Sequence, residues 1–382
     1  MKELSKKVQG LKPSGIRKFF DLVLNAKDII SLGVGEPDYP TPWNITEQAI
    51  YYLENGYTSY TSNHGLLSFR EEIAKYNKNR FGSNYDPAKE IMITMGVSEG
   101  LDIAFRALIN PEDEIIIPTP SYVSYEPLIT LAGGTPVTIN TAPDNFVLTK
   151  DKLLDSITDK TKALLLSYPN NPTGAALTEQ ELKDIIEIVK EKDLYLISDE
   201  VYTELTYEEK PLSASTYLKD NLILLNGLSK SHAMTGWRIA WICAPEIILE
   251  QLVKIHQYNA LCAPIMSQYA GIEALKNGSK AMQSMKDSYE KRRNFFYYGL
   301  KGIGFDVLKP KGAFYIFPGI KKFGLKAEDF AIRLLKEQKV AVVPGDAFGD
   351  GLDDYLRMCY ACSIEDLKEA LLRIEKFVKS LK

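Results

Sequence analysis

Short apolar segments alternate with amphipathic segments through the middle of this chain, and this alternation limits the folds that are open to it. The apolar segments carry almost no charge, which is typical of strands buried on both faces of a sheet. Strands that alternate with helices favour a mostly parallel sheet covered by helices on both sides. The sequence therefore predicts an α/β fold. The predicted strands are residues 91–94, 114–117, 135–139, 163–167, 194–198, 222–225 and 239–243, and the predicted helices include 67–81, 99–108 and 179–192, the last with Thr178 as its N-cap.

Beyond about residue 278 the pattern changes to strands separated by short turns, followed by helices. This order favours a smaller α+β domain. We expect a large domain over residues 40–280, and a small domain formed by residues 1–39 together with 281–382. A helix around residues 16–23 is expected to pack with the small domain. The predicted elements of the C-terminal part are helices 285–300, 327–338 and 364–381 and strands 305–308, 313–317, 340–343 and 355–359.

Composition excludes several classes of function. The net charge of −4 gives no electrostatic footprint for nucleic acid. The longest uncharged apolar runs, 163–166 and 239–245, are too short to cross a bilayer. The first residues lack the apolar core of a signal peptide, so we expect a cytoplasmic protein without a membrane partner. Cys359 and Cys362 form a Cys-x-x-Cys spacing, but no second pair completes a zinc site, so no metal is expected.

Polar residues follow several of the predicted strands. Because parallel strands place their carboxyl ends at one edge of a sheet, where ligands bind, these residues are expected to form a site. Gly33 and Gly35 do not make a dinucleotide fingerprint, since the third glycine is missing and Pro37 opposes the required helix. A turn lining a site is the better interpretation of these glycines. The residues after the strands are Ser98, Tyr122, Asn171, Asp199 and Lys230.

The residue types at this edge fit one cofactor. Lys230 lies between two serines, a setting in which desolvation lowers the pKa of an amine that forms Schiff bases. A buried Asp199 needs a charged partner, such as a protonated ring nitrogen. Arg238 and the helix N-terminus at Ser98 offer a phosphate clamp. These groups match pyridoxal 5′-phosphate. Taken alone, Lys230 fits a solvated loop lysine equally well, and Ser98 an ordinary helix cap.

The motifs in order resemble one family. Residues 169–174 (Pro-Asn-Asn-Pro-Thr-Gly), 199–202 (Asp-Glu-Val-Tyr), 229–230 (Ser-Lys) and 236–238 (Gly-Trp-Arg) are similar to those of class I/II aminotransferases of the pyridoxal-phosphate fold type I superfamily, the group of aspartate and aromatic aminotransferases. The resemblance extends over essentially the whole chain. It implies a large domain with a mostly parallel sheet sandwiched by helices, plus a smaller α+β domain.

The resemblance also implies a role for each site residue. Lys230 would form the internal aldimine and carry the proton between the substrate Cα and the cofactor, while Asp199 would hold the ring nitrogen protonated. Asn171 and Tyr202 would bind the phenolic oxygen, and Tyr122 would stack on the ring. Phosphate would be bound by Val97, Ser98, Ser229, Arg238 and, across the interface of a homodimer, Tyr60. The substrate carboxylate would be bound by Arg357 and Gly35, beside Tyr122 and Asn171.

The implied function is transfer of the amino group of an L-amino acid to a 2-oxo acid such as 2-oxoglutarate, by a ping-pong cycle through Lys230. The donor is aromatic, aspartate or broad, and Tyr122 in place of a tryptophan slightly favours aromatic or broad specificity. A lyase or decarboxylase on the same scaffold, such as a carbon–sulfur lyase, stays open, and the need for a 2-oxo acid distinguishes it. A regulatory module is disfavoured because the chain shows no basic helix-turn-helix segment.

Four positions depart from the family pattern. Gly227 stands where a hydroxyl is common, so one phosphate contact is expected to be absent. Ala240 stands where glycine is common, and His232 where an aromatic residue is. His64 replaces a small residue in the tyrosine loop and is expected to be an exposed loop histidine, with a role in specificity as the alternative.

Overall fold

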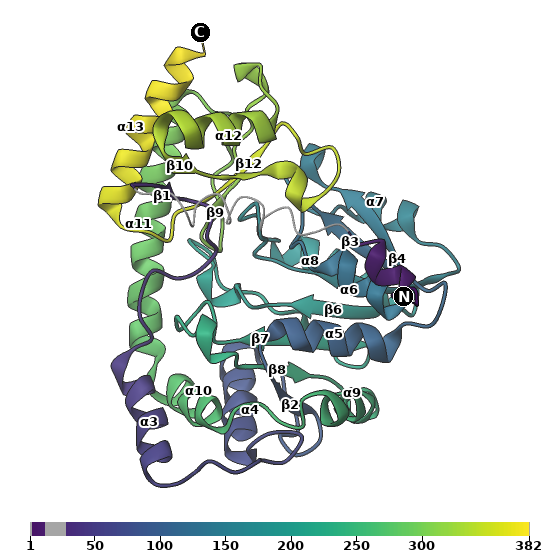
Figure 1. Ribbon diagram of the computed structural model, residues 1–382. Coiled ribbons are helices and arrows are strands. Elements are labelled where there is room, and N and C mark those ends of the chain that lie inside the picture. Colours follow the sequence, from purple (N-terminus) through teal and green to yellow (C-terminus); the bar gives the residue numbers. More distant parts are fainter. Residues whose placement is uncertain (1, 12–27, 382) are drawn as a thin grey trace.

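A seven-stranded sheet forms the centre of the computed structural model, which describes residues 2–11 and 28–381 (Figure 1). Its strand order is β2–β8–β7–β6–β5–β3–β4. Strand β8 runs antiparallel to both of its neighbours, and the other adjacent pairs are parallel. The predicted α/β class with a mostly parallel sheet is therefore confirmed. The strands are β2 Ile91–Thr94, β3 Glu114–Thr119, β4 Thr135–Asn140, β5 Thr161–Leu166, β6 Tyr195–Asp199, β7 Leu222–Gly227 and β8 Ala240–Cys243.

Helices cover both faces of this sheet because the strands are apolar on both faces. In β7, Leu222 and Leu224 belong to the core on one face, with α4, α7, α8 and α10, whereas Ile223 and Leu225 belong to the core on the other, with α5, α6 and α9. This alternation follows from the two-residue period of a strand. The helices of this part are α3 Trp43–Glu54, α4 Leu67–Phe81, α5 Val97–Leu108, α6 Tyr125–Ala132, α7 Lys150–Ser156, α8 Glu179–Glu191, α9 Glu246–Asn259 and α10 Ile265–Asn277.

A separate core lies above the large sheet in Figure 1 and is built around two small sheets. One sheet has the order β11–β12–β9, and the other pairs β1 with β10 in parallel, which joins the N-terminal segment to the C-terminal part. This separate core supports the division at residues 40 and 280, which stays our proposal. The elements are β1 Ile30–Ser31, β9 Tyr315–Ile316, β10 Val340–Ala341, β11 Val343–Pro344, β12 Leu356–Cys359, α11 Ser279–Ile303, α12 Ala327–Gln338 and α13 Ile364–Ser380.

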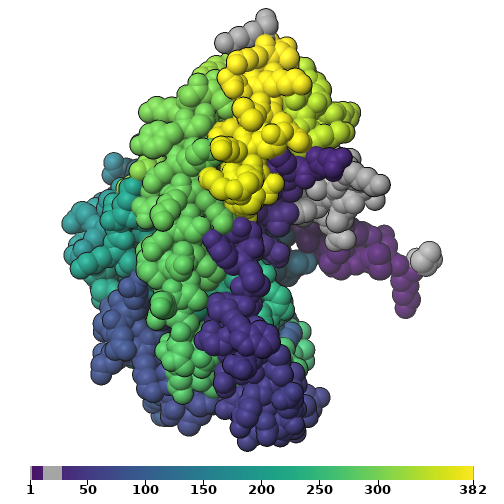
Figure 2. All heavy atoms as spheres, turned by 90° about the vertical axis from the view of Figure 1, so that its left-hand side faces the viewer, coloured from purple at the N-terminus to yellow at the C-terminus, as the bar shows by residue number. Residues whose placement is uncertain are grey.

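Helix α11 links the two parts. Figure 2 shows α11 in green along one side of the molecule, with α13 in yellow above and the dark purple α3 segment below. Its residues Met285, Tyr289 and Phe296 are buried in the small core.

No helix among the described residues is long and apolar enough to span a bilayer. The remaining short helix, α1, covers Lys6–Gln9.

The structure corrects several predicted boundaries. Residues 305–308 form no strand, since only an isolated bridge joins Asp306 to Gly319. The predicted strand 340–343 is two strands in different sheets, β10 and β11. Helix α11 starts six residues before the predicted start at 285, and α5 starts at Val97 rather than at residue 99. The helix expected around residues 16–23 lies outside the described residues. Length and periodicity identify the type of each element better than its ends.

The predicted N-cap of α8 is confirmed, and it is part of a capping box. The Thr178 hydroxyl accepts from Glu181 N at 3.3 Å, and Glu181 Oε2 accepts from Thr178 N at 2.7 Å. These two bonds satisfy two backbone donors that the helix itself leaves free.

We predict that Thr178→Ala lowers the free energy of unfolding by about 1 kcal/mol, because it leaves one of these donors without its partner. Urea denaturation measures the change. Thr178→Ser is the matched control and should stay close to wild type. Equal losses in the two variants would contradict a stabilising cap.

Candidate active site

A cavity of about 320 Å³ opens beside the carboxyl ends of β5, β6 and β7. Its volume is within the range of small-molecule sites. All of the predicted site residues except Tyr60 line it. Tyr60 is 82% exposed and is not among the lining residues of its own chain. The predicted residues in the lining are Gly35, Val97, Ser98, Tyr122, Asn171, Asp199, Tyr202, Ser229, Lys230, Arg238 and Arg357.

Lys230 follows strand β7 and carries the amine of the site. Its Nζ donates a hydrogen bond to the carbonyl oxygen of Gly35 at 2.8 Å. Burial lowers the pKa of Lys230 to about 8, against a smaller opposing effect of Glu36. A neutral amine is the form that attacks a carbonyl group, so the lowered pKa makes Lys230 a competent nucleophile near neutral pH. A solvated loop lysine, the alternative interpretation, does not fit this environment.

Asp199 is the last residue of β6 and is 5% exposed. Its Oδ2 accepts a hydrogen bond from the Tyr125 hydroxyl at 2.8 Å, and its Oδ1 accepts from Val201 N at 3.3 Å. Burial raises the pKa of Asp199 to about 6, while the hydrogen bond from Tyr125 acts in the opposite direction. A carboxylate accepts about four hydrogen bonds, so Asp199 keeps acceptor capacity facing the cavity.

The N-terminus of α5 and Arg238 form an anion cradle. Helix α5 begins after Gly96, whose φ of 79° favours glycine. The N-cap of α5 is Gly96, and no side chain makes a cap hydrogen bond there, so Ser98 is not its N-cap. A Cβ on Gly96 would lie 2.6 Å from Arg238 Nη2, which places the guanidinium directly against this turn. Free N–H groups, the positive end of the helix and a guanidinium therefore converge at one point.

Arg357, on β12, is a buried cation at the other end of the cavity. It is 3% exposed, and its guanidinium lies between the Tyr315 and Phe348 rings, 4.7 and 4.8 Å from their centroids. Its Nη1 donates to Asn171 Oδ1 at 3.1 Å, and its Nη2 donates to the carbonyl oxygen of Gly33. The two rings fix the plane of the fork, which suits bidentate binding of a carboxylate.

Several lining residues were not predicted from the sequence, among them Tyr125, Tyr315 and Glu36. Tyr125 follows Tyr122 by three residues, at the start of α6, and this spacing could have indicated a shared position. No sequence signal identified Tyr315, whose hydroxyl lies 2.8 Å from the Tyr202 hydroxyl. A Cβ on Gly35 would collide with the Tyr315 hydroxyl, which explains the glycine there.

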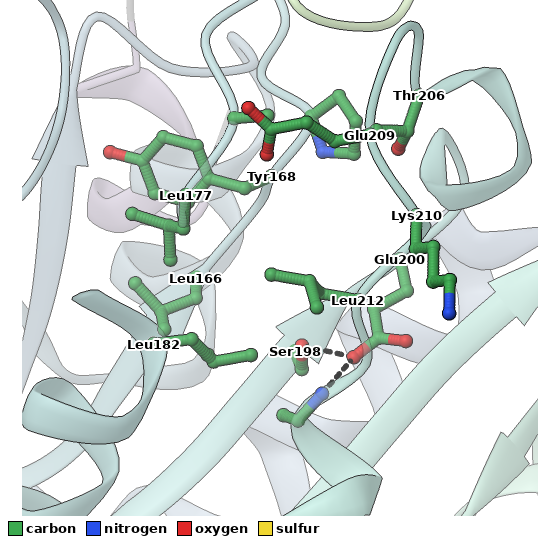
Figure 3. A pocket seen from close by; sticks show the side chains of 13 residues that line it. Leu166, Tyr168, Leu177, Leu182, Ser198, Glu200, Thr206, Glu209, Lys210 and Leu212 are labelled. Atoms are coloured by element: carbon green, nitrogen blue, oxygen red, sulfur yellow. Dashed lines mark hydrogen bonds between the residues drawn. The ribbon is translucent and has the colours of Figure 1, made fainter. Parts of the chain in front are cut away.

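A second, smaller cavity lies on the opposite side of β6 and is lined by Ser198 and Glu200 (Figure 3). The Glu200 carboxylate accepts from the Ser198 hydroxyl at 2.9 Å and from Ala214 N at 2.8 Å. Burial raises the pKa of Glu200 to about 7. The cavity measures about 30 Å³, room for a water molecule or two and not for a substrate. Strand alternation thus separates Asp199, which faces the large cavity, from Glu200.

Two of the departures from the family pattern, at positions 227 and 240, are linked because the two residues are paired across neighbouring strands. Gly227 and Ala240 lie directly opposite each other in β7 and β8. A Cβ on Gly227 would lie 2.9 Å from the Ala240 Cβ, closer than such atoms come in real structures. The Ala240 methyl group, together with Ile239 O at 3.1 Å, therefore leaves room only for glycine at position 227, which accounts for the missing hydroxyl.

The two histidines that depart from the family pattern, His64 and His232, do not line the cavity. His232 is 5% exposed, and its Nδ1 lies 2.8 Å from the Ser231 hydroxyl; burial lowers the pKa of His232 to about 4. His64 is half-buried rather than exposed, and burial lowers its pKa as well. The interpretation of His64 as an exposed loop histidine is therefore wrong.

The fold and the cavity, with an amine and a carboxylate at neighbouring strand ends, are those of an enzyme that acts on small molecules. The chain belongs to the family of class I and II aminotransferases, whose family model matches residues 27–374. The predicted aminotransferase activity is thereby confirmed.

Relatives and solved structures match over nearly the whole chain. A Bacillus subtilis protein named "Probable N-acetyl-LL-diaminopimelate aminotransferase" is 45% identical over 98% of this chain and 95% of its own. Aromatic-amino-acid aminotransferase 2 of Thermococcus litoralis is 42% identical over 99% of both chains. The solved structure of Thermus thermophilus aspartate aminotransferase with maleate superposes on this chain with a TM-score of 0.95. The two sequences are 33% identical, and the match covers 98% of this chain and 100% of the other.

We predict that Lys230 of the cofactor-free protein reacts with an amine-selective acylating reagent at a rate that rises through a midpoint near pH 8, since burial lowers its pKa to about 8. Peptide mapping by mass spectrometry measures labelling against pH. The denatured protein is the control, in which the midpoint should return to about 10.4. A native midpoint near that value would show that the amine is not desolvated.

Proposed function

We propose that this aminotransferase holds pyridoxal 5′-phosphate in the 320 Å³ cavity and moves an amino group from an L-amino acid to a 2-oxo acid in two half-reactions. The observation that carries the proposal is the position of Lys230 and Asp199 at neighbouring strand ends, both lining one cavity. Their pKa values are shifted toward neutrality from opposite sides, which is typical of catalytic groups.

The residues present fit this cofactor. The spare acceptor capacity of Asp199 suits a protonated ring nitrogen, and the cradle formed by Gly96 and Arg238 suits a phosphate group. Asn171 and Tyr202 line the cavity with groups that suit a phenolic oxygen, and Tyr122 offers a ring to stack on the cofactor. Val97, Ser98 and Ser229 also line the cavity and complete the proposed phosphate contacts.

When bound, the cofactor supplies an aldehyde for the substrate amine and a ring that accepts the electron pair left at the substrate Cα. Lys230 Nζ would take the proton from the substrate Cα and deliver it to the carbonyl carbon of the cofactor, a role that suits a pKa near the working pH. Asp199, ionised above about pH 6, holds positive charge on the ring nitrogen. Arg357 binds the substrate α-carboxylate, and its stacked guanidinium fixes the direction from which the substrate enters.

The proposed specificity is for aromatic L-amino acids or for a broad range of L-amino acids as donors, with aspartate as the other candidate. Among the described residues that line the cavity, the cationic side chains are Lys230, Arg238 and Arg357, and each has a role in the site. Within residues 2–11 and 28–381, no further cation lines the cavity to pair with a second substrate carboxylate. Tyr122 and Tyr315 offer aromatic walls instead.

We also propose a homodimer in which Tyr60 contributes to the phosphate site of the partner subunit. Tyr60 is 82% exposed and lies outside its own cavity. Other large apolar side chains are exposed as well, including Trp43 at 67% and Tyr258 at 88%. Asn63 Nδ2 donates to Leu261 O at 2.9 Å, which holds the Tyr60 loop against the segment after α9.

Lys230→Ala should abolish transamination and the visible absorption band that the wild-type protein acquires with pyridoxal phosphate. Absorption spectra and a coupled assay with 2-oxoglutarate measure both effects. Lys160→Ala, a change at an exposed lysine, is the control and should behave as wild type. A wild-type protein that stays colourless with added cofactor would refute the proposal, and turnover without any 2-oxo acid would instead support a lyase.

Mixed dimers test the role of Tyr60. Lys230→Ala and Tyr60→Ala proteins should each be weakly active or inactive, but refolding them together should restore activity. Restoration follows because one site per mixed dimer combines Lys230 of one subunit with Tyr60 of the other. If Tyr60 serves its own subunit, no site is intact and the mixture stays inactive.

A further inference from the structure

Tyr125 contacts two of the residues proposed to bind the cofactor. Its hydroxyl donates to Asp199 Oδ2 at 2.8 Å. Its ring meets the Tyr122 ring edge-on, with centroids 5.5 Å apart and planes at 80°. Tyr125 is 2% exposed, so neither contact competes with bulk water.

The backbone ties the same residues together. Tyr125 is the first residue of α6, and its N–H donates to the carbonyl oxygen of Tyr122 at 3.1 Å. The Tyr125 ring also belongs to the core between the sheet and α5, with Leu101 and Ile117. Packing of this kind leaves the ring one position, so the hydroxyl and the ring edge are held in fixed directions.

The contact with Asp199 has an electrostatic consequence. Burial alone favours the neutral carboxylic acid, which would be a poor partner for a cationic ring nitrogen. A hydrogen bond donated to the carboxylate favours the ionised form. Among the groups that act on Asp199, the Tyr125 hydroxyl is the strongest one that opposes burial, ahead of Val201 N and Lys230.

We propose that Tyr125 is a positioning residue of the cofactor site: its hydroxyl keeps Asp199 ionised and turned toward the ring nitrogen, and its ring holds Tyr122 against the ring face. This inference rests on the proposed function. Tyr125 itself touches neither substrate nor reacting atoms in this proposal and acts through Asp199 and Tyr122. The competing view is that Tyr125 only fills the core, and the two views differ in what happens when the hydroxyl alone is removed.

Tyr125→Phe keeps the ring and removes the hydroxyl. The measurement is the affinity of the cofactor-free variant for pyridoxal phosphate and for an analogue in which a carbon replaces the ring nitrogen. We expect about a tenfold loss of affinity for pyridoxal phosphate, in line with a hydrogen bond to a charged group. Affinity for the carbon analogue should be unchanged from wild type, because no ring nitrogen is present for Asp199 to bind.

The pH dependence of binding gives a second readout. Removal of the hydroxyl leaves burial less opposed, so the pKa of Asp199 rises above about 6. Pyridoxal phosphate affinity in Tyr125→Phe should therefore fall at a higher pH than in wild type as the solution is acidified. The titratable groups near Asp199 that both proteins share, those of Lys230, Glu200 and Tyr202, act equally in the two and cancel in this comparison.

Tyr168→Phe is the matched control, because the Tyr168 hydroxyl bonds to the backbone of Phe146 and Leu148 away from the large cavity. It should leave the ratio of the two affinities unchanged. Equal losses for both ligands in Tyr125→Phe, or no loss for either, would overturn the proposal in favour of a core-filling role. Failure of the wild-type protein to bind pyridoxal phosphate would instead refute the proposed function, and with it this inference.

Discussion

The partly buried amine of Lys230 is the constraint on which the rest of the site depends. Burial of an ammonium group is costly, so the pKa of Lys230 is lowered, and its Nζ donates a hydrogen bond to the carbonyl oxygen of Gly35. That acceptor comes from the segment after β1, which pairs with β10 of the C-terminal part. The hydrogen bond therefore joins the small sheets to the loop after β7. The amine of Lys230 and the guanidinium of Arg357 are held relative to each other by the same segment, because the carbonyl oxygen of Gly33 accepts from Arg357.

The large sheet determines which polar groups meet. Asp199 ends β6 and faces the large cavity, while Glu200, the next residue along, turns to the opposite side and is bonded there by Ser198 and Ala214. Two adjacent carboxylates are thereby separated by the backbone of one strand. Both are buried and both pKa values are raised, but only one has a cavity large enough to hold a partner for its charge.

Much of the fold and of the candidate site was predictable, because both depend on local patterns. Apolar runs identified the seven strands of the large sheet, and the polar residues after five of them identified the edge where the site lies. Residues whose role depends on distant contacts were missed: Tyr315 reaches the cavity only because Gly35 leaves room for it. Residues 340–343 look like one strand because apolar content does not reveal that Ala341 and Val343 belong to different sheets.

The pair formed by Gly227 and Ala240 has a consequence for how this lineage can change. A hydroxyl-bearing residue cannot enter position 227 while the methyl group of Ala240 is present, since the two Cβ atoms would be 2.9 Å apart. Ala240→Gly removes that methyl group, but Ile239 O at 3.1 Å and the Cα of residue 240 at 3.2 Å stay close to the new Cβ. A residue larger than glycine at position 227 therefore requires both a change at position 240 and a small displacement of the β8 backbone.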